Sequence, residues 1–381
     1  MGFRIQIFSI YVEEKGKYTM AKTQLFSPGP VMVKDNVRKA LLHYDICHRS
    51  PEFEAMFQDT QKKINKLFNA DDTYYSVIVS GSGTSANETA LSSIFKKGEK
   101  VLLISNGEFG NRLEEIIKKY KIPMVKAGFK WAEYPDVAKI EKLIVANPAV
   151  KVVAMVFHET STGMINPVKE VGKLCKKYDK WFYVDTVSAA GGENIDVKKN
   201  NITITSSVGG KCVGAFPGSA YICGKRSVLE RLTPDMGKNV YLNLAKHYQI
   251  AKAKHQTPNT PNVTLFWALN QALTNIQKDT LAKHIARYKE CSKMLRDGMR
   301  DMGLKFLLDK KYMSNTVTSV FLPEGVDLSK FIKKMEKHGY TVYKGKGEYE
   351  KQGMFQVANM GEIYPKDCVK FLKALADCIK K

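Results

Sequence analysis

Short apolar runs alternate with stretches of helical period between about residues 75 and 225. Apolar residues recur three or four positions apart between the runs, as they do in amphipathic helices that cover a sheet. This alternation predicts an α/β fold with a mostly parallel sheet covered on both faces. The expected strands are Ser76–Ser80, Val101–Ser105, Val152–Phe157, Phe182–Asp185 and Ser219–Cys223, and the expected helices surround Leu91, Ile116, Ile140 and Val171.

The pattern changes after about residue 265. A long helical stretch from Leu265 to about Met302 precedes a strand, helix, strand, strand, helix series that ends near Ile379. This order predicts a smaller α+β domain. We expect the two domains to pack tightly with a ligand at their junction, because no low-complexity linker separates them. The expected strands of the smaller domain are Thr316–Leu322, Tyr340–Tyr343 and Met354–Val357.

Composition narrows the class of protein. The chain has 381 residues, of which 44% are hydrophobic, enough to bury a large core. No apolar stretch approaches the ~20 residues that cross a bilayer, and the start lacks a small-residue cleavage site. The seven cysteines form no C-x-x-C pair, so we expect reduced thiols and no metal site. These features predict a cytoplasmic protein with no membrane partner.

The net charge of +22 raises the question of an acidic partner. Much of the excess comes as separate lysine pairs on predicted helix faces, for example Lys62–Lys63 and Lys118–Lys119. Such pairs are typical of solvated faces, and no nucleic-acid-binding motif accompanies them. We therefore expect no nucleic-acid partner. A positive field would still attract a small phosphorylated or phosphonate substrate.

Asp185 ends one apolar run, and Lys211 follows it by 26 residues in a glycine-rich segment. A lysine with few neighbours to solvate it can be neutral and nucleophilic near pH 7. An aspartate at a strand end can hold a positive charge on a ligand. The pair therefore fits a Schiff-base lysine and the partner of the protonated ring nitrogen of pyridoxal 5'-phosphate (PLP). It also fits a solvated lysine and a capping aspartate.

Three other strand ends carry residues suited to a ligand. The loop Ser80–Glu88 opens a helix and offers glycines, hydroxyls and free backbone N–H groups to a phosphate. Phe109 lies in a glycine-containing segment and can stack on a flat ring. The hydroxyl-rich segment His158–Gly163 can serve a ligand oxygen. Each segment alone also fits a turn, a cap or a core residue, but the carboxyl ends of parallel strands converge on one place.

In this order the segments resemble the class V aminotransferases of PLP fold type I, from about Phe26 to the C-terminus. Phe26–Pro30 and His48–Phe53 match the opening motifs of that family. Within the class, the resemblance is closest to the aminotransferases of 2-aminoethylphosphonate and pyruvate. It is carried by Ser105–Arg112, His158–Pro167 and Asn359–Tyr364.

The resemblance implies a role for each matching residue. Lys211 would bind PLP covalently and shuttle a proton, and Asp185 would pair with the ring nitrogen. Phe109 and Val187 would cover the two faces of the ring, and Thr160 would reach its hydroxyl. The phosphate would be held by Ser82, Gly83 and Thr84, and by Thr257 and Thr260 of a partner subunit. A homodimer with shared active sites is implied.

The resemblance also implies a domain division. Residues 1–19 would be an N-terminal extension, and residues 20–30 would lie near the active site and the small domain. Residues 31–264 would form the large PLP-binding domain. Residues 265–381 would form the interdomain helix and the small α+β domain.

Two positions depart from the family pattern. Gly210 stands where the family usually has Asn or Gln before the lysine. Gln356 stands where the motif Phe-Arg-Ile-Gly-Asn has an arginine that binds the substrate's carboxylate or phosphonate. An amide does not replace a bidentate guanidinium. Losing such a contact typically costs ~1.5–3 kcal/mol.

The first functional hypothesis is an aminotransferase of phosphonate metabolism. It would move an amino group between a small phosphonate- or phosphate-bearing amine, such as 2-aminoethylphosphonate, and a 2-oxo acid. Ser27 and Gln356 are candidate substrate residues, and Arg49, Lys344 or Lys346 could supply the missing anion contact.

Two other hypotheses stay open. Gln356 also favours a PLP-dependent decarboxylase or lyase acting on a small phosphorylated amino acid, because the carboxylate clamp is missing. A non-enzymatic basic protein on a vestigial scaffold is the third hypothesis. Intact Lys211, Asp185 and Phe109 weigh against it.

Overall fold

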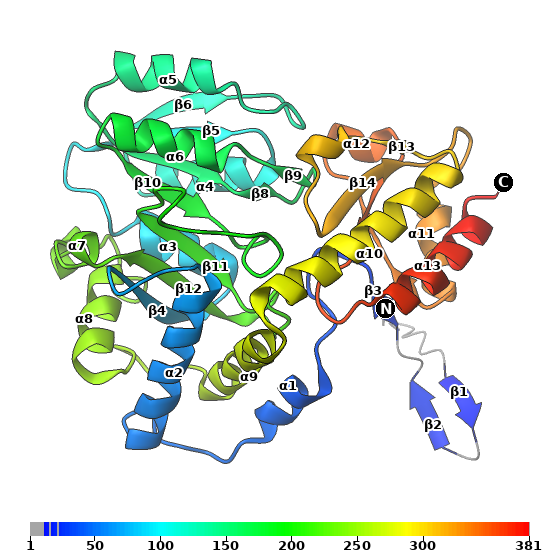
Figure 1. The fold of residues 1–381 in the computed structure, drawn as a ribbon, viewed down its shortest axis with the longest axis horizontal. Coiled ribbons are helices and arrows are strands. Elements are labelled where there is room, and N and C mark those ends of the chain that lie inside the picture. The colour runs from blue at the N-terminus through cyan, green and yellow to red at the C-terminus, as the bar shows by residue number, and fades with distance from the viewer. Residues whose placement is uncertain (1–10, 15–16, 21–22, 381) are drawn as a thin grey trace, which may run out of the picture.

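A seven-stranded sheet organises the first two thirds of the chain (Figure 1). The computed structural model describes residues 11–14, 17–20 and 23–380. The strand order is β4-β12-β11-β10-β7-β5-β6; β12 is antiparallel to both neighbours and the other pairs are parallel. The predicted α/β class is thus confirmed. The strands are β4 (Tyr74–Gly81), β5 (Lys100–Ser105), β6 (Met124–Gly128), β7 (Val150–Val156), β10 (Trp181–Asp185), β11 (Ile204–Val208) and β12 (Gly218–Lys225).

The five expected strands are present, but the sequence pattern missed β6 and β11. The sequence of β11 is Ile-Thr-Ser-Ser-Val, too polar for a strand recognised by apolar runs, yet every residue of it is buried. Its hydroxyls are satisfied inside the sheet: Thr205 Oγ1 donates to Val184 O at 2.8 Å and Ser207 Oγ donates to Thr186 O at 3.2 Å. Burial of hydrogen-bonded hydroxyls carries little penalty, so the strand tolerates this composition.

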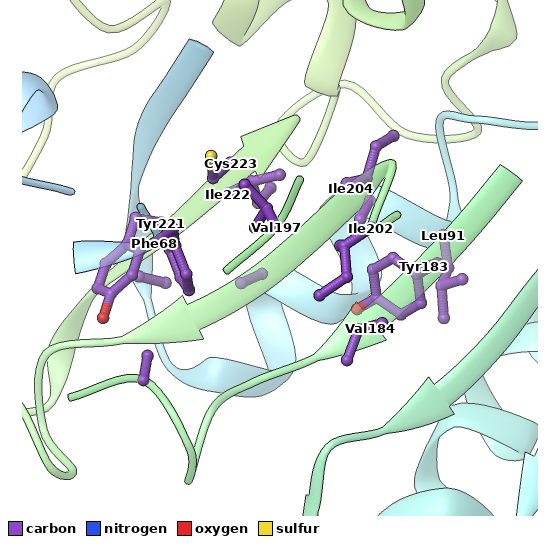
Figure 2. Packing of buried hydrophobic residues seen from close by; sticks show 14 of the residues in the cluster. Phe68, Leu91, Tyr183, Val184, Val197, Ile202, Ile204, Tyr221, Ile222 and Cys223 are labelled. Atoms are coloured by element: carbon purple, nitrogen blue, oxygen red, sulfur yellow. The ribbon is translucent and has the colours of Figure 1, made fainter. Parts of the chain in front are cut away.

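Helices pack against this sheet and bury its apolar residues. Figure 2 shows part of that core, where Phe68 and Tyr221 lie together beside β12 and Leu91 lies beside Tyr183 of β10. All four predicted crossover helices are present, as α3, α4, α5 and α6. The helices of this part are α1 (Asp35–Lys39), α2 (Pro51–Leu67), α3 (Gly83–Leu91), α4 (Glu108–Lys119), α5 (Val137–Ala146), α6 (Val168–Lys177), α7 (Arg226–Leu229), α8 (Leu244–Lys254) and α9 (Val263–Asp279).

A second, smaller core lies around an antiparallel sheet of order β13-β14-β17-β16. The predicted strand Tyr340–Tyr343 is divided there into β15 and β16. Strand β15 pairs in parallel with β3 (Gln24–Leu25), which ties the start of the chain to this part. The elements are α10 (Leu281–Asp301), β13 (Lys305–Phe306), β14 (Val317–Phe321), α11 (Leu328–Lys337), β15 (Tyr340–Thr341), β16 (Tyr343–Lys344), α12 (Glu348–Lys351), β17 (Met354–Ala358) and α13 (Pro365–Cys378).

The single long helix expected from Leu265 to Met302 is wrong, because Thr280 divides it into α9 and α10. Thr280 has φ 66° and ψ 144°, outside the helical region, and its hydroxyl accepts the Lys283 N–H as the N-cap of α10. Helix α9 packs with the first core and α10 with the second. The break therefore lets the chain change direction between the two parts (Figure 1).

The predicted N-terminal extension falls partly outside the described residues, which exclude 1–10 and 15–16. Within it, β1 (Tyr11–Glu14) and β2 (Lys17–Met20) pair as an antiparallel hairpin. No helix in the described part of the chain is both long and apolar enough to span a bilayer.

Candidate functional site

A cavity of about 340 Å³ lies where the strand ends of the large sheet meet the smaller part. Residues after β4, β5, β7, β10 and β11 contribute to its wall, as do Tyr343, Lys346 and Gln356 of the smaller part. The structure thus brings together most of the residues that the sequence singled out. Those that line the cavity are Ser82, Gly83, Thr84, Phe109, Thr160, Asp185, Val187, Lys211 and Gln356.

Lys211 reaches into the cavity from the loop after β11. Its Nζ donates a hydrogen bond to the carbonyl of Pro28. Gly29 must lack a side chain here, because a Cβ would lie 2.4 Å from Nζ and φ is +133°. Desolvation, together with the charges of Lys346 and Arg112, lowers the Lys211 pKa to about 8. The amine is therefore neutral in a substantial fraction of molecules just above neutral pH.

Asp185 presents a buried carboxylate at the end of β10. Its oxygens accept hydrogen bonds from Asn87 Nδ2 at 2.6 Å and from the Val187 N–H at 2.8 Å. Burial raises the Asp185 pKa, while these two bonds oppose the shift by stabilising the ionised form. A cation brought next to this carboxylate would therefore relieve a desolvation cost, as a protonated ring nitrogen does.

Asn87 is a site residue that the sequence reasoning missed. It lies in α3, and its Oδ1 accepts a hydrogen bond from Tyr183 OH at 3.0 Å, which fixes the amide so that Nδ2 faces Asp185. The sequence feature that could have indicated Asn87 is its position in Ser80–Glu88, one helical turn after the glycine loop. Its partner, however, lies 98 positions away.

The N-terminus of α3 suits an anion. Ser82 is the N-cap, and among the described residues no side chain caps the first-turn N–H groups. Those groups and the helix dipole are the usual components of a phosphate site. Gly83 allows Val187 to approach closely, because a Cβ would lie 2.7 Å from Val187 Cγ2. The predicted phosphate loop therefore contacts Val187, the residue expected on one face of the cofactor ring.

Glu159 holds the start of α4 and was also missed. Its fully buried carboxylate accepts the N–H groups of Phe109 at 3.2 Å and Gly110 at 3.0 Å. Burial raises the Glu159 pKa, while bonds from Ser161 and these backbone groups lower it. A Cβ at Gly107 would lie 2.4 Å from the Glu159 side chain, so that glycine makes room for the carboxylate. Glu159 thereby positions Phe109 at the cavity.

Gln356 lies on β17 and is almost fully buried. Its Nε2 donates to the carbonyls of Thr160 at 2.8 Å and Ser161 at 3.1 Å, and lies 3.0 Å from Ser319 Oγ. The amide hydrogens are therefore used to hold the hydroxyl-rich loop. Thr160 Oγ1 itself donates to Ser188 Oγ at 2.6 Å.

Two cationic side chains besides Lys211 line the described cavity, namely Arg112 and Lys346. Both contact Glu108 Oε1, Arg112 Nη2 at 3.3 Å and Lys346 Nζ at 2.6 Å. The sequence pointed to Lys346 as a candidate anion contact, whereas Arg112 was recognised only as the last residue of the motif Ser105–Arg112. Lys344 lies outside the cavity and pairs with Glu350 at 3.5 Å.

The remaining candidates do not line the cavity of this chain. Arg49 donates to Gln256 Oε1 at 2.7 Å and to Thr257 O at 2.9 Å, so it holds the segment that carries Thr257 and Thr260. Ser27 Oγ donates to Pro30 O at 3.4 Å, next to the cavity wall formed by residues 28–30.

Comparison with known proteins decides the family. The profile described as aminotransferase class-V matches residues 26–350. The chain belongs to the class V aminotransferases. It is 33% identical to an uncharacterized aminotransferase of Methanocaldococcus jannaschii, over 96% of this chain and 94% of that protein. It is 30% identical to a 2-aminoethylphosphonate–pyruvate transaminase of Vibrio cholerae, over 93% and 97%.

Solved structures agree on the fold. An alanine–glyoxylate aminotransferase from Nostoc sp. superposes with a TM-score of 0.88 at 25% identity, covering 97% of this chain and 98% of that one. A pyridoxamine–pyruvate aminotransferase from Mesorhizobium loti gives 0.87 at 23% identity, covering 94% of this chain and 92% of that one, and shows the shared fold. The protein is therefore a fold type I enzyme of the aminotransferase class, and its cofactor is PLP.

The cavity residues fit that cofactor. An amine of lowered pKa, a buried carboxylate that lacks a cation, an uncapped helix N-terminus and an aromatic ring occur together in one cavity. These are the groups needed to attach an aldehyde, pair with a pyridinium nitrogen, bind a phosphate and cover a ring. When bound, PLP supplies an electron sink for the substrate's Cα.

The structure gives a steric reason for a glycine at position 210. A Cβ at position 210 would lie 2.8 Å from the backbone N of Pro217 and 2.9 Å from its Cα. Backbone atoms cannot move aside as a flexible side chain can. The family's usual amide therefore has no room before Lys211.

We expect the reactivity of Lys211 to follow its lowered pKa. Below about pH 8, the rate of covalent PLP attachment to cofactor-free protein should rise about tenfold per pH unit, because the neutral fraction of the Lys211 amine rises by the same factor. Above about pH 8 the rate should level off, because most of the amine is then neutral. The rate is measured by absorbance, and Lys211→Arg is the control that retains charge but cannot attach PLP. A rate that still climbs beyond pH 10 would contradict the lowered pKa.

We expect Gly210→Asn to lower the free energy of unfolding by about 1–3 kcal/mol, because the side chain overpacks against the Pro217 backbone. Gly214 is a matched control in the same loop: it has φ +74° and open space around it, which asparagine tolerates. Gly214→Asn should therefore lose less than about 1 kcal/mol. Denaturant unfolding measures both, and equal losses would show that the clash is not the cause.

Proposed function

We propose that this enzyme transfers an amino group between a small amine bearing a phosphonate or phosphate, such as 2-aminoethylphosphonate, and a 2-oxo acid such as pyruvate. The observation that carries the proposal is the placement of two cationic side chains, Arg112 and Lys346, in the cavity that also contains Lys211 and Asp185. The likeness to 2-aminoethylphosphonate–pyruvate transaminases over most of the chain supports it.

In this proposal the chain's own groups bind and orient the reactants. Lys211 Nζ would hold the cofactor covalently and, as a free amine, would move the proton at the substrate's Cα. Asp185, which accepts hydrogen bonds from Asn87 and the Val187 N–H, would pair in its ionised form with the protonated ring nitrogen. Phe109 and Val187 exclude water from the ring faces. Ser82, Gly83 and Thr84 would bind the phosphate at the α3 N-terminus, and Thr160 would reach the ring hydroxyl.

We also propose a homodimer in which Thr257 and Thr260 complete the partner's phosphate site. In one chain these residues lie outside the cavity, and Arg49 holds their segment by bonds to Gln256 and Thr257. Such a segment is already ordered for a contact across an interface.

A panel of amines tests the substrate proposal. The PLP-loaded enzyme is assayed with 2-aminoethylphosphonate, phosphorylated amines and neutral amines, each with pyruvate, 2-oxoglutarate or glyoxylate. We expect turnover with a phosphonate- or phosphate-bearing amine. Lys211→Ala should abolish it, because the other lysine that lines the described cavity, Lys346, is paired with Glu108 at 2.6 Å. Turnover of neutral amines only would refute the proposed substrate class.

The same assay addresses a PLP-dependent decarboxylase or lyase. Gln356 favours that alternative, because its amide hydrogens bind Thr160 O and Ser161 O rather than a substrate carboxylate. Release of CO₂ or ammonia from a small phosphorylated amino acid without a 2-oxo acid would establish it. Amino transfer with neither release would dismiss it.

A further inference from the structure

The substrate's acidic group needs a cationic partner, and β17 does not supply one. Gln356 is neutral, and its Nε2 is committed to Thr160 O, Ser161 O and Ser319 Oγ. A buried amide bound in this way has no spare N–H pair to offer a phosphonate or carboxylate. The anion of the substrate must therefore be recognised elsewhere in the cavity.

We infer that Arg112 and Lys346, linked through Glu108, form the anion-recognition site for the substrate's phosphonate group. The inference deepens the proposed function and rests on it. The site lies on the Phe109 side of the cavity, with Arg112 from α4 of the large part and Lys346 from the loop after β16 of the smaller part.

The positions of the two cations support this assignment. The Arg112 Cζ lies 4.8 Å and the Lys346 Nζ 5.5 Å from the centroid of the Phe109 ring, so both lie beside the same aromatic side chain. Both also contribute to lowering the Lys211 pKa, which places their charges within electrostatic reach of the reacting amine. All three side chains line the same cavity of about 340 Å³, so one small ligand can contact them together.

The charges of the cluster favour an anion. Arg112 and Lys346 carry two positive charges and Glu108 one negative charge, which leaves a surplus of one positive charge. The guanidinium has five N–H donors, and the contact with Glu108 at 3.3 Å uses one nitrogen, Nη2. The side chains are 36% and 38% exposed, so a substrate oxygen can reach them from the cavity. A doubly charged phosphonate fits this pair better than a neutral group.

Glu108 has a second effect in this arrangement. In the absence of substrate it neutralises part of the cationic pair and holds both side chains next to Phe109. It also repels a substrate anion, so the net attraction comes from the two cations together. Removing either one should leave a site that is electrically neutral overall and weak for anions.

The test measures the amine half-reaction alone, so that the 2-oxo acid does not complicate the result. The absorbance change of the PLP-loaded enzyme is followed with 2-aminoethylphosphonate and with propylamine, which lacks the distal charge. Arg112→Gln and Lys346→Gln should each raise the half-saturating concentration of 2-aminoethylphosphonate about 10–100-fold. The half-saturating concentration of propylamine should change less than about threefold, because propylamine presents no anion to either side chain.

Lys118→Gln is the matched control, because it removes the same charge from the same helix at a residue that pairs with Glu114 away from the cavity. It should behave as wild type. Arg112→Lys keeps the charge but loses the guanidinium fork, so it should recover part of the affinity. If the Arg112 and Lys346 variants match the control towards 2-aminoethylphosphonate, the inference is overturned.

A binding measurement separates this inference from the proposed function. Calorimetric titration of the PLP-loaded protein with methylphosphonate needs no turnover. We expect binding that weakens about tenfold or more in Arg112→Gln and Lys346→Gln and is unchanged in Lys118→Gln. Equal binding by all variants overturns the anion site, even if the enzyme transfers amino groups. Weakened binding in an enzyme that uses no phosphonate amine retains the site and refutes the substrate.

Discussion

The active site depends on the amine of Lys211, which is buried away from water and donates a hydrogen bond to a backbone carbonyl. Lys211 donates to the carbonyl of Pro28, while nearby cations oppose its protonation. Pro28 belongs to the segment that connects β3, paired with β15 of the smaller part, to the first core. The contact therefore joins the reactive loop of the large part to the smaller part. Glycine is favoured at position 29 chiefly by its φ of +133°, and the absence of a side chain leaves room for the amine.

Two buried carboxylates then fix the geometry around that lysine, each by a different arrangement. Asp185 is held by a side-chain amide and one backbone N–H, and it faces the cavity with a charge that burial disfavours. Glu159 faces the first turn of α4, where the backbone N–H groups of Phe109 and Gly110 and the helix dipole compensate its charge. The Asp185 carboxylate can therefore pair with a cation of a bound ligand. The Glu159 carboxylate is instead compensated within the protein and positions Phe109.

The fold class and most of the cavity wall were predictable because the information is local. Strand-end segments such as Ser80–Glu88 and the one containing Phe109 carry their glycines and hydroxyls in the sequence, and parallel strands bring their ends together. Asn87 and Glu159 were missed because their roles depend on partners distant in the chain. Strand β11 was missed because its hydroxyls are satisfied only once the sheet forms. The helix break at Thr280 depends on a backbone conformation unusual for threonine.

The position of Gln356 explains how an amide on β17 supports the hydroxyl-rich loop. The amide keeps two donated bonds to Thr160 O and Ser161 O, which hold the hydroxyl-rich loop at the cavity wall. The amide brings no charge to the cavity. Besides Lys211, the cations of the described cavity wall are Arg112 and Lys346, which are partly exposed and come from different parts of the fold. Recognition of an anion by both Arg112 and Lys346 requires the large and smaller parts of the fold to be correctly placed. Substrate binding is therefore coupled to the packing of these two parts.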